Sequence, residues 1–293
     1  MFSILIPTYN VSTLSLVKTI HNQAEKTQIP FEILVFDDAS PKPSEENKLI
    51  NDLPHASYTE RTINVGRSAI RNLLAESARF ETLLFLDADV LPKRPNFIHN
   101  YVSQLQAPVD VIAGGIVYAE DKPPKKSMLR YCYGNARETR SVDQRNQQTH
   151  IVVSANLYIK KTLFLKINTL KENSYGDDLV LSQQLKSLGI DVLHIDNPVI
   201  HLGLETSEVF INKSFEALET IVHLEKKGEL DPNTTALQQA YQRNKKRGLL
   251  PLIRLTVFLL SPIIKANLHS AHPSLFLFDL YRLNHYIKLK KHA

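Results

Sequence analysis

Carboxylate side chains occur in closely spaced pairs along this sequence, and the pair formed by Asp87 and Asp89 is well suited to hold a cation. These two acids are one residue apart and follow the apolar residues 83–86. In an extended strand, side chains two residues apart point to the same side, so both carboxylates would face one ligand. Such oxygens suit a hard divalent cation that holds a substrate phosphate. The alternative is a strand end followed by an Asp-rich turn, and residues 83–90 alone leave both interpretations open.

The elements that must position these acids alternate over the first 90 residues. Apolar runs that end in polar clusters predict strands, and the segments between them predict helices. Strands are expected at 2–6, 31–36, 57–62 and 83–86, and helices at 12–24, 47–51 and 67–77. This order predicts an α/β fold with a parallel sheet, whose ligands bind at the carboxyl ends of the strands. No GxGxxG and no P-loop signature (GxxxxGKS or GxxxxGKT) occurs, which excludes those two phosphate-binding motifs.

The pattern is less regular after residue 90. A strand is expected at 109–118, interrupted by Gly114 and Gly115, and a long loop with some helix is expected at 119–148. Residues 172–175 read as a further loop. The remaining expected elements are strands at 150–159 and 191–195 and helices at 160–167, 176–188, 209–227 and 233–247.

Composition places the chain among ordinary globular proteins with an uneven distribution of charge. It has 293 residues, of which 43% are hydrophobic, and the single Cys132 excludes an internal disulfide and a cysteine-based zinc site. The first 205 residues carry 22 Lys or Arg against 23 Asp or Glu, whereas residues 206–293 carry 13 against 7. A nearly neutral body with a basic tail argues against nucleic acid as a partner, because the binding domain itself should then be basic.

The basic tail contains an apolar segment, residues 249–264, that includes Arg254 and two prolines. It is short for a membrane-spanning helix, and basic residues at 243–247 precede it. Basic residues beside an apolar helix are typical of an anchor that lies in the plane of a membrane surface. The alternative is a helix that packs on the catalytic domain or in a dimer interface.

Six segments together resemble family 2 glycosyltransferases, over roughly residues 1–205. Each segment is weak evidence alone, but their order and spacing are specific. They are Ile6-Pro7-Thr8-Tyr9-Asn10, Phe36-Asp37-Asp38-Ala39-Ser40, Asn64-Val65-Gly66 through Arg71-Asn72, Phe85 to Asp89, Gly176-Asp177-Asp178 and Val199-Ile200-His201.

The resemblance implies a GT-A fold, with a mixed, mainly parallel sheet followed by a helical extension. It divides the chain into a glycosyltransferase domain at 1–205, with a nucleotide-binding half at 1–118 and an acceptor-binding half at 119–205, and a basic extension at 206–293. It implies an enzyme that transfers a sugar, with inversion, from a nucleotide-sugar such as a UDP- or GDP-sugar. The expected acceptor is a glycan or glycolipid, and the expected location is the cytoplasmic face of a membrane, which the extension would contact.

The resemblance also implies roles for individual residues. Asp178 matches the catalytic base, and Asp89, Asp87 and His201 match the positions that hold Mg²⁺ or Mn²⁺ on the donor diphosphate. The implied nucleotide and sugar contacts are Pro7, Thr8, Tyr9, Asp38, Arg71, Asp87, Asn156 and Asp177. A helix start would lower the basicity of Asp178, while the Asp177 charge and exclusion of water would raise it.

Two other classes of function use a similar set of residues. A nucleotidyltransferase also places an acid pair and a metal at a strand end, but it would normally have a glycine-rich basic loop near the start, where this chain has Pro7-Thr8-Tyr9-Asn10. A non-catalytic carbohydrate-binding protein could retain the fold, although the complete set of acids argues against it.

Overall fold

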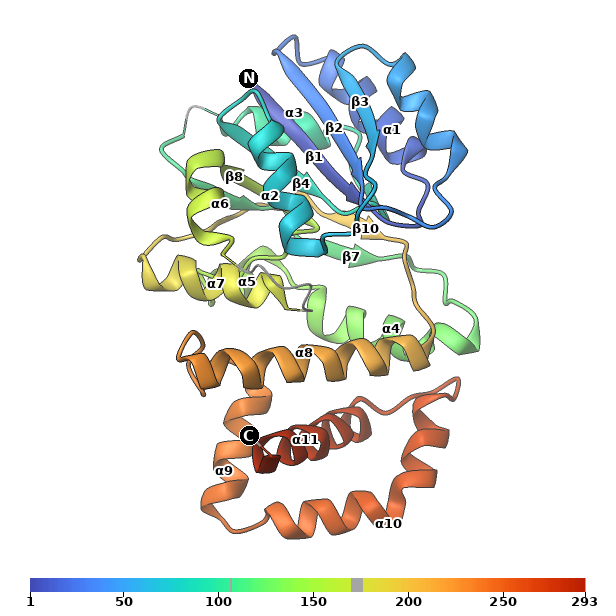
Figure 1. Ribbon diagram of the computed structural model, residues 1–293, viewed down its shortest axis with the longest axis vertical. Helices are drawn as coiled ribbons and strands as arrows, with labels where there is room; N and C mark the ends of the chain where they lie inside the picture. The colour runs from blue at the N-terminus through green and yellow to red at the C-terminus, as the bar shows by residue number, and fades with distance from the viewer. Residues whose placement is uncertain (106, 170–175, 293) are drawn as a thin grey trace. The chain divides into compact units, whose positions relative to one another are not determined.

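The structure is a computed structural model that describes residues 1–105, 107–169 and 176–292. It divides into two compact units, which are described separately (Figure 1). The first unit comprises residues 1–119 and 138–203, and the second comprises residues 120–137 and 204–293. The loop expected at Glu172–Tyr175 lies outside the described residues.

A seven-stranded sheet forms the centre of the first unit, with the strand order β3-β2-β1-β4-β8-β6-β9. Its strands are β1 (Phe2–Thr8), β2 (Phe31–Asp37), β3 (Ala56–Glu60), β4 (Thr82–Leu86), β6 (Val111–Ala113), β8 (Asn156–Lys160) and β9 (Leu193–His194). The first four strands pair in parallel, whereas β8 is antiparallel to both β4 and β6. The prediction of a mixed, mainly parallel sheet is therefore confirmed.

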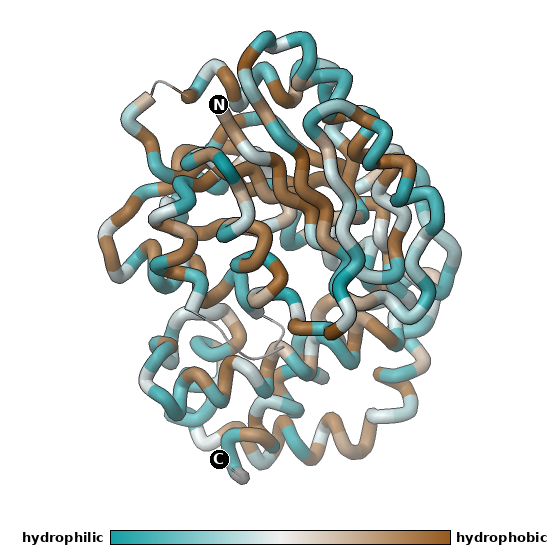
Figure 2. Tube along the Cα trace, turned by 45° about the horizontal axis from the view of Figure 1, so that its top comes forward, coloured by the Kyte–Doolittle hydropathy of each residue, from teal (hydrophilic) through white to brown (hydrophobic). Residues whose placement is uncertain are grey.

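Alternating side chains of the strands supply two hydrophobic cores, one on each face of the sheet. In β1, Ile4 and Ile6 belong to one core and Leu5 to the other, and all three are fully buried. Apolar residues accordingly run along the strands in Figure 2. The helices of this unit are α1 (Leu14–Glu25), η1 (Glu45–Asp52), α2 (Arg67–Ser77), α3 (Phe97–Val102), α5 (Val142–Asn146), α6 (Lys161–Ile167) and α7 (Asp177–Ser187).

The helices divide between the two faces according to which core their apolar residues enter. α1 and α3 contribute to the core that contains Ile4, and α2, α6 and α7 contribute to the core that contains Leu5. This is a three-layer arrangement in which α2 and α7 lie on the same side of the sheet. That shared side places the residues at their N-terminal ends within reach of one another.

A second sheet of three short strands carries the predicted histidine to the predicted acids. Its order is β5 (Val90–Pro92), β10 (Val199–His201) and β7 (Ile116–Tyr118). The register pairs His201 with Val90 on one side and with Tyr118 on the other. Because Val90 directly follows Asp89, strand pairing brings together residues more than 100 positions apart in the sequence.

The second unit is helical. Its helices are η2 (Lys125–Ser127), α4 (Met128–Tyr133), α8 (Ser207–Lys227), α9 (Ala236–Lys246), α10 (Leu250–Leu268) and α11 (Leu275–His292), and a π-helical turn follows α4 at Gly134–Glu138. Leu129 of α4 is buried in one cluster with Ile211, Val257 and Phe278, which explains why residues 120–137 group with the C-terminal helices. The sequence analysis had placed this segment in the first domain and had not identified α11.

A buried carboxylate in the first unit gives a test of the fold. Glu32 is 4% exposed and accepts hydrogen bonds from Ser3 Oγ (2.6 Å), Arg79 N (2.6 Å) and Arg79 Nε (2.8 Å). Replacing Glu32 by Ala leaves buried donors without an acceptor and should lower the free energy of unfolding by about 1–3 kcal/mol. Urea denaturation measures this. Glu45→Ala, which removes an exposed ion pair with Lys48, is the control and should leave the midpoint unchanged.

Candidate active site

The acids Asp87 and Asp89 lie in a turn and not in a strand. β4 ends at Leu86 and β5 begins at Val90, so the alternation of side chains expected of a strand does not set their directions. Asp87 instead bonds to an arginine, and Asp89 faces a histidine. The expected shared orientation rested on strand geometry, which does not apply to these two residues because they follow the end of β4.

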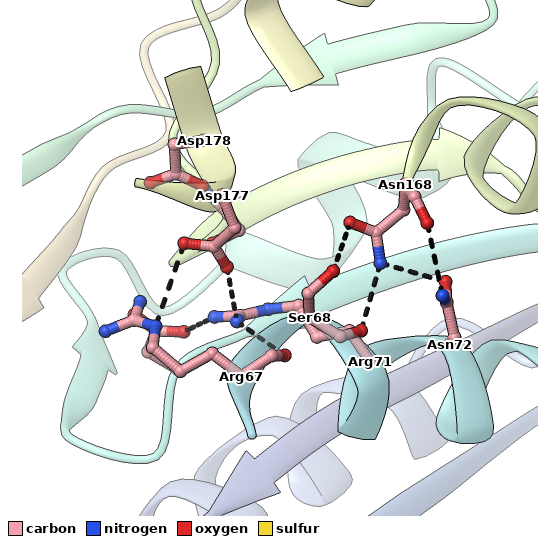
Figure 3. A network of polar contacts seen from close by, with 9 residues as sticks. Arg67, Ser68, Arg71, Asn72, Asn168, Asp177 and Asp178 are labelled. Atoms are coloured by element: carbon pink, nitrogen blue, oxygen red, sulfur yellow. Dashed lines mark hydrogen bonds and ion pairs between the residues drawn. The ribbon is translucent and has the colours of Figure 1, made fainter. Parts of the chain in front are cut away.

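Arg71 joins two of the predicted acids. Its Nη2 lies 2.6 Å from Asp87 Oδ1 and its Nη1 lies 3.0 Å from Asp177 Oδ2 (the contact to Asp177 is drawn in Figure 3). The arginine is 2% exposed, and Nη1 also donates to the Arg67 carbonyl at 3.2 Å. Two guanidinium nitrogens are thus committed to carboxylates within the protein. Arg71 thus holds two of the predicted acids together, and its expected contact to the nucleotide base stays a prediction.

Arg67 adds a second positive charge one helical turn before Arg71. Its Nε lies 3.8 Å from Asp177 Oδ1, while its side chain is 38% exposed. Burial opposes ionisation of Asp87, but the charges of Arg71 and Arg67 outweigh burial and hold the pKa of Asp87 below its usual value. Asp87 therefore stays a carboxylate at neutral pH. Sequence reasoning missed Arg67, although its spacing of four residues from Arg71 on a helix was the available signal.

Asp178 is the second residue of α7 and lies beside this network. Gly176, which caps the helix, adopts a φ of 117°, and the Asp178 carboxylate accepts a hydrogen bond from Ser154 N at 2.9 Å. Burial raises the pKa of Asp178 to about 6, the Asp177 charge acts in the same direction, and Arg71 and Arg67 oppose them. Of the two opposing effects expected at this helix start, desolvation is the larger. The result is a carboxylate that can accept a proton near neutral pH.

The helix that carries Arg71 is tied to the chain before α7 by side-chain amides. Asn168 accepts a hydrogen bond from Ser68 Oγ at 2.9 Å, and it donates to the Ser68 carbonyl (3.0 Å) and to Asn72 Oδ1 (2.8 Å). Asn72 in turn donates to the Asn168 carbonyl at 3.1 Å (Figure 3). These bonds fix the position of α2 relative to residue 168.

Asp89 and His201 form the second part of the site. Asp89 Oδ2 lies 3.6 Å from His201 Nε2, and Leu202 N donates to the Asp89 carbonyl at 2.8 Å. Burial raises the pKa of Asp89, and the repulsion from Asp87 adds to this while His201 opposes it. Gly203 packs against the carboxylate so closely that a Cβ there would lie 1.9 Å from Asp89 Oδ2. No sequence signal had identified Gly203.

These residues fit a divalent cation only if the substrate supplies further ligands. Among the residues that the structure describes, no group of three or more His, Cys, Asp or Glu side chains could hold a metal ion by itself. Asp89 and His201 offer one oxygen and one nitrogen, and Asp87 is engaged by Arg71. A cation that keeps one or two carboxylate ligands and takes its other ligands from a substrate diphosphate matches this set.

The polar residues predicted to contact the nucleotide fall into two groups. Both oxygens of Asp38 accept backbone N–H bonds, from Val65 and Gly66 at 2.8 Å each, and Thr8 Oγ1 donates to the Val11 carbonyl at 3.1 Å. Both side chains are buried and hold loops in place. Tyr9 is 48% exposed and Pro7 is half-buried, so these two present accessible surface at the carboxyl end of β1.

Asn156 lies in a closed network under the turn of Gly114. Its Oδ1 accepts from Tyr101 Oη at 2.6 Å, and its Nδ2 donates to the carbonyls of Gly115 and Asn197 at 2.9 Å each. A Cβ at Gly114 would lie 2.4 Å from three atoms of this network. Asn156 is 2% exposed and its amide is satisfied within the protein. The amide therefore holds this network together, and its expected contact to sugar stays a prediction.

The fold and these residues define a class of protein. The sequence profile described as "Glycosyl transferase family 2" matches residues 3–167, which is more than half of the chain. The chain belongs to this family. The match ends before Asp177 and Asp178, so the assignment of the base depends on the geometry described above.

Particular relatives extend the comparison. The chain is 29% identical over 119 residues to a chondroitin synthase of Pasteurella multocida (strain Pm70), a stretch that covers 39% of this chain and 12% of that protein. The chain thus spans only a small part of the length of this relative.

Solved structures share the GT-A fold at low sequence identity. A mannosyltransferase, PcManGT from Pyrobaculum calidifontis, in complex with GDP-Man and Mn²⁺, has a TM-score of 0.55 at 15% identity and covers 98% of this chain and 86% of its own. TarS residues 1–349 from S. aureus have a TM-score of 0.51 at 15% identity, covering 100% and 92%. Mannosyl-3-phosphoglycerate synthase from Rubrobacter xylanophilus has a TM-score of 0.55 at 16% identity, covering 79% and 76%.

The contact between Gly203 and Asp89 gives a test of the cation site. Gly203→Ala must displace the Asp89 carboxylate, so the apparent affinity for Mn²⁺ in the presence of a nucleoside diphosphate should fall about tenfold or more. Melting temperature as a function of Mn²⁺ concentration, with the nucleotide held constant, measures this. Asp89→Ala is the reference for complete loss of the ligand. Unchanged Mn²⁺ dependence in both variants would exclude Asp89 as a ligand.

Proposed function

We propose that the protein transfers a sugar from a nucleotide-sugar to an acceptor hydroxyl with inversion at the anomeric carbon. The observation that carries this proposal is the half-buried Asp178 carboxylate, whose pKa is raised to about 6 beside the Asp177–Arg71–Asp87 network. Family membership supports the transfer of a sugar, and the mannosyltransferase bound to GDP-Man and Mn²⁺ supports a UDP- or GDP-sugar as donor.

The proposed reaction is one displacement. Asp178 takes the proton of the acceptor hydroxyl while that oxygen attacks the anomeric carbon of the donor. The bond between this carbon and the diphosphate oxygen breaks, and the nucleoside diphosphate leaves with the electron pair. Attack from the side opposite the leaving group inverts the configuration. A higher pKa makes a carboxylate a stronger base, but it lowers the fraction of the enzyme in which that carboxylate is ionised. A pKa near the working pH is the best compromise between the two.

The two arginines give the acids different properties. Arg71 and Arg67 keep Asp87 ionised, while Asp178 does not bond to either guanidinium and retains a raised pKa. In the proposed roles, Asp87 and Asp89 face the donor and Asp178 faces the acceptor. Arg71 contacts Asp87 and also Asp177, which precedes Asp178 in the chain. From one helix it would therefore position both the proposed donor side and the proposed acceptor side.

Asp89 and His201, with Asp87 nearby, would hold Mg²⁺ or Mn²⁺ together with the donor diphosphate. When bound, such a cation supplies positive charge to the oxygens of the leaving diphosphate. Tyr9 and Pro7 offer accessible surface for the nucleotide at the carboxyl end of β1.

We also propose that the acceptor is a glycan or glycolipid at the cytoplasmic face of a membrane. Among the described residues, α10 is the one helix that is long and apolar enough to cross a membrane. Only 11% of its most apolar stretch is buried. Arg254 within this helix and Lys265 in its last turn favour a position in the plane of the surface over a spanning one.

Removal of the proposed base gives the first test. Asp178→Asn should lower kcat by about 10²–10⁴-fold with little change in donor affinity, because the amide keeps the size of the side chain but cannot accept the proton. Release of nucleoside diphosphate in the presence of acceptor measures the rate, and calorimetry measures donor binding. Asp191→Asn, which changes an exposed acid, is the matched control. A wild-type rate in Asp178→Asn would remove the assigned base.

The pH dependence gives a second test. Asp178 must be ionised to act, so kcat/KM should be constant above about pH 7 and should fall about tenfold per pH unit below about pH 6. Because the Asp177 charge helps to raise the pKa of Asp178, Asp177→Asn should move the acid limb to lower pH. An acid limb that does not move in this variant would contradict the proposed coupling.

A further inference from the structure

We propose that the groove between α10 and α11 binds the phosphate of an anionic phospholipid headgroup while the exposed face of α10 enters the bilayer surface. This inference rests on the membrane attachment in the proposed function, and it names the surface and the class of lipid. α10 and α11 belong to the same unit and lie side by side in Figure 1.

The charged residues that line the groove are all basic. It has a volume of about 610 Å³, and Arg254 and Lys265 of α10 and Lys288 of α11 line it. No carboxylate lines it, and none of these three cations forms an ion pair within the described ranges. Arg254 and Lys265 lie about three helical turns apart on α10, so they extend positive charge along the groove, and this favours the binding of anionic headgroups there.

The sequence around the groove also contains an excess of basic residues. Between Asp231 and Asp279 there is no acidic residue, while six Lys or Arg occur: Arg243, Lys245, Lys246, Arg247, Arg254 and Lys265. A solvated helix face would normally intersperse both signs of charge. A one-signed stretch next to an apolar helix favours an anionic surface as partner.

Apolar side chains on α10 continue from the groove into solvent. Leu252, Leu255, Phe258, Leu259 and Ile263 are between 53% and 77% exposed. Leu255 and Phe258 also line the groove, so the apolar and basic surfaces are continuous. Soluble monomers rarely expose contiguous apolar surface of this kind without a partner. A bilayer surface would cover both surfaces, because its acyl chains would contact the leucines and phenylalanine and its phosphates would contact the cations.

A buried amide gives an independent indication of a ligand. Asn284 of α11 lines the groove and is 6% exposed, yet its Oδ1 has no hydrogen-bond partner in the described part of the chain. A buried polar atom without a partner is costly unless something absent from the chain satisfies it. The Asn284 oxygen is an acceptor, so it would accept a hydrogen bond from a headgroup hydroxyl, such as those of a glycerol headgroup, while the cations bind the phosphate.

Vesicle binding tests the proposal with the full chain. The protein is sedimented with vesicles of phosphatidylcholine alone or with 30% phosphatidylglycerol added, and inorganic phosphate is included in a separate series. The triple variant R254Q/K265Q/K288Q is compared with K18Q/K26Q/K42Q, which removes three exposed lysines from the first unit. Each cation at an anionic surface contributes about fivefold to binding, so the groove variant should lose about a hundredfold in affinity and the control much less.

The outcomes are distinct. Phe258→Ser with Leu259→Ser should release the protein from phosphatidylglycerol vesicles at high salt, where the apolar contribution remains. Wild-type affinity of the groove variant, equal binding to phosphatidylcholine alone, or full displacement by millimolar phosphate would overturn the proposal. A wild-type dimer that the apolar variant converts to a monomer would also overturn it, because the face would then bind a second copy.

The same experiment separates this inference from the proposed activity. Hydrolysis of a nucleotide-sugar without vesicles should be equal in the wild type and the groove variant. If the wild type shows no nucleotide-sugar turnover at all, the proposed function fails, whereas vesicle binding still decides the role of the groove.

Discussion

The buried guanidinium of Arg71 is the interaction on which the arrangement of the first unit depends. It forms close ion pairs with both Asp87 and Asp177, and Arg67 adds a more distant positive charge beside Asp177. Removing a charge of this kind from water is costly, and two short contacts to opposite charges offset that cost. The same pairing leaves Asp178 outside the ion pairs, so that burial decides its pKa. One arginine therefore separates an acid that stays ionised from an acid that titrates near neutral pH.

The sequence predicted most of the secondary structure because its apolar runs are well separated by polar clusters. α2 was predicted with the bounds that the structure has, and the mixed sheet and the GT-A fold were confirmed. The helix α11 was missed because it begins with the consecutive apolar residues 275–278, which do not follow a helical period. The grouping of residues 120–137 with the C-terminal helices depends on the burial of Leu129, which no local pattern reveals.

Residue types at strand ends indicated where the site lies, but not what each side chain does there. Asp38, Arg71 and Asn156 match positions associated with ligands, yet their polar atoms bond to the backbone or to other side chains. Whether a buried polar group serves a ligand or the protein depends on tertiary distances, and a single sequence does not contain them. Arg67 and Gly203, in contrast, were not identified from the sequence, although they contact the predicted acids. Their importance comes from proximity to Asp177 and Asp89, which only the folded chain shows.

The ion pair between Arg71 and Asp177 also has a consequence for the order of folding. It joins residues 106 positions apart, whereas the pair with Asp87 spans only 16. Closing the longer loop is slower and costs more chain entropy. Until α7 docks, Arg71 has one of its two counterions, and burying it is correspondingly unfavourable. The ion pair with Asp177 therefore closes last. A chain that has formed its strands but has not docked α7 is held back from the native state by an electrostatic penalty.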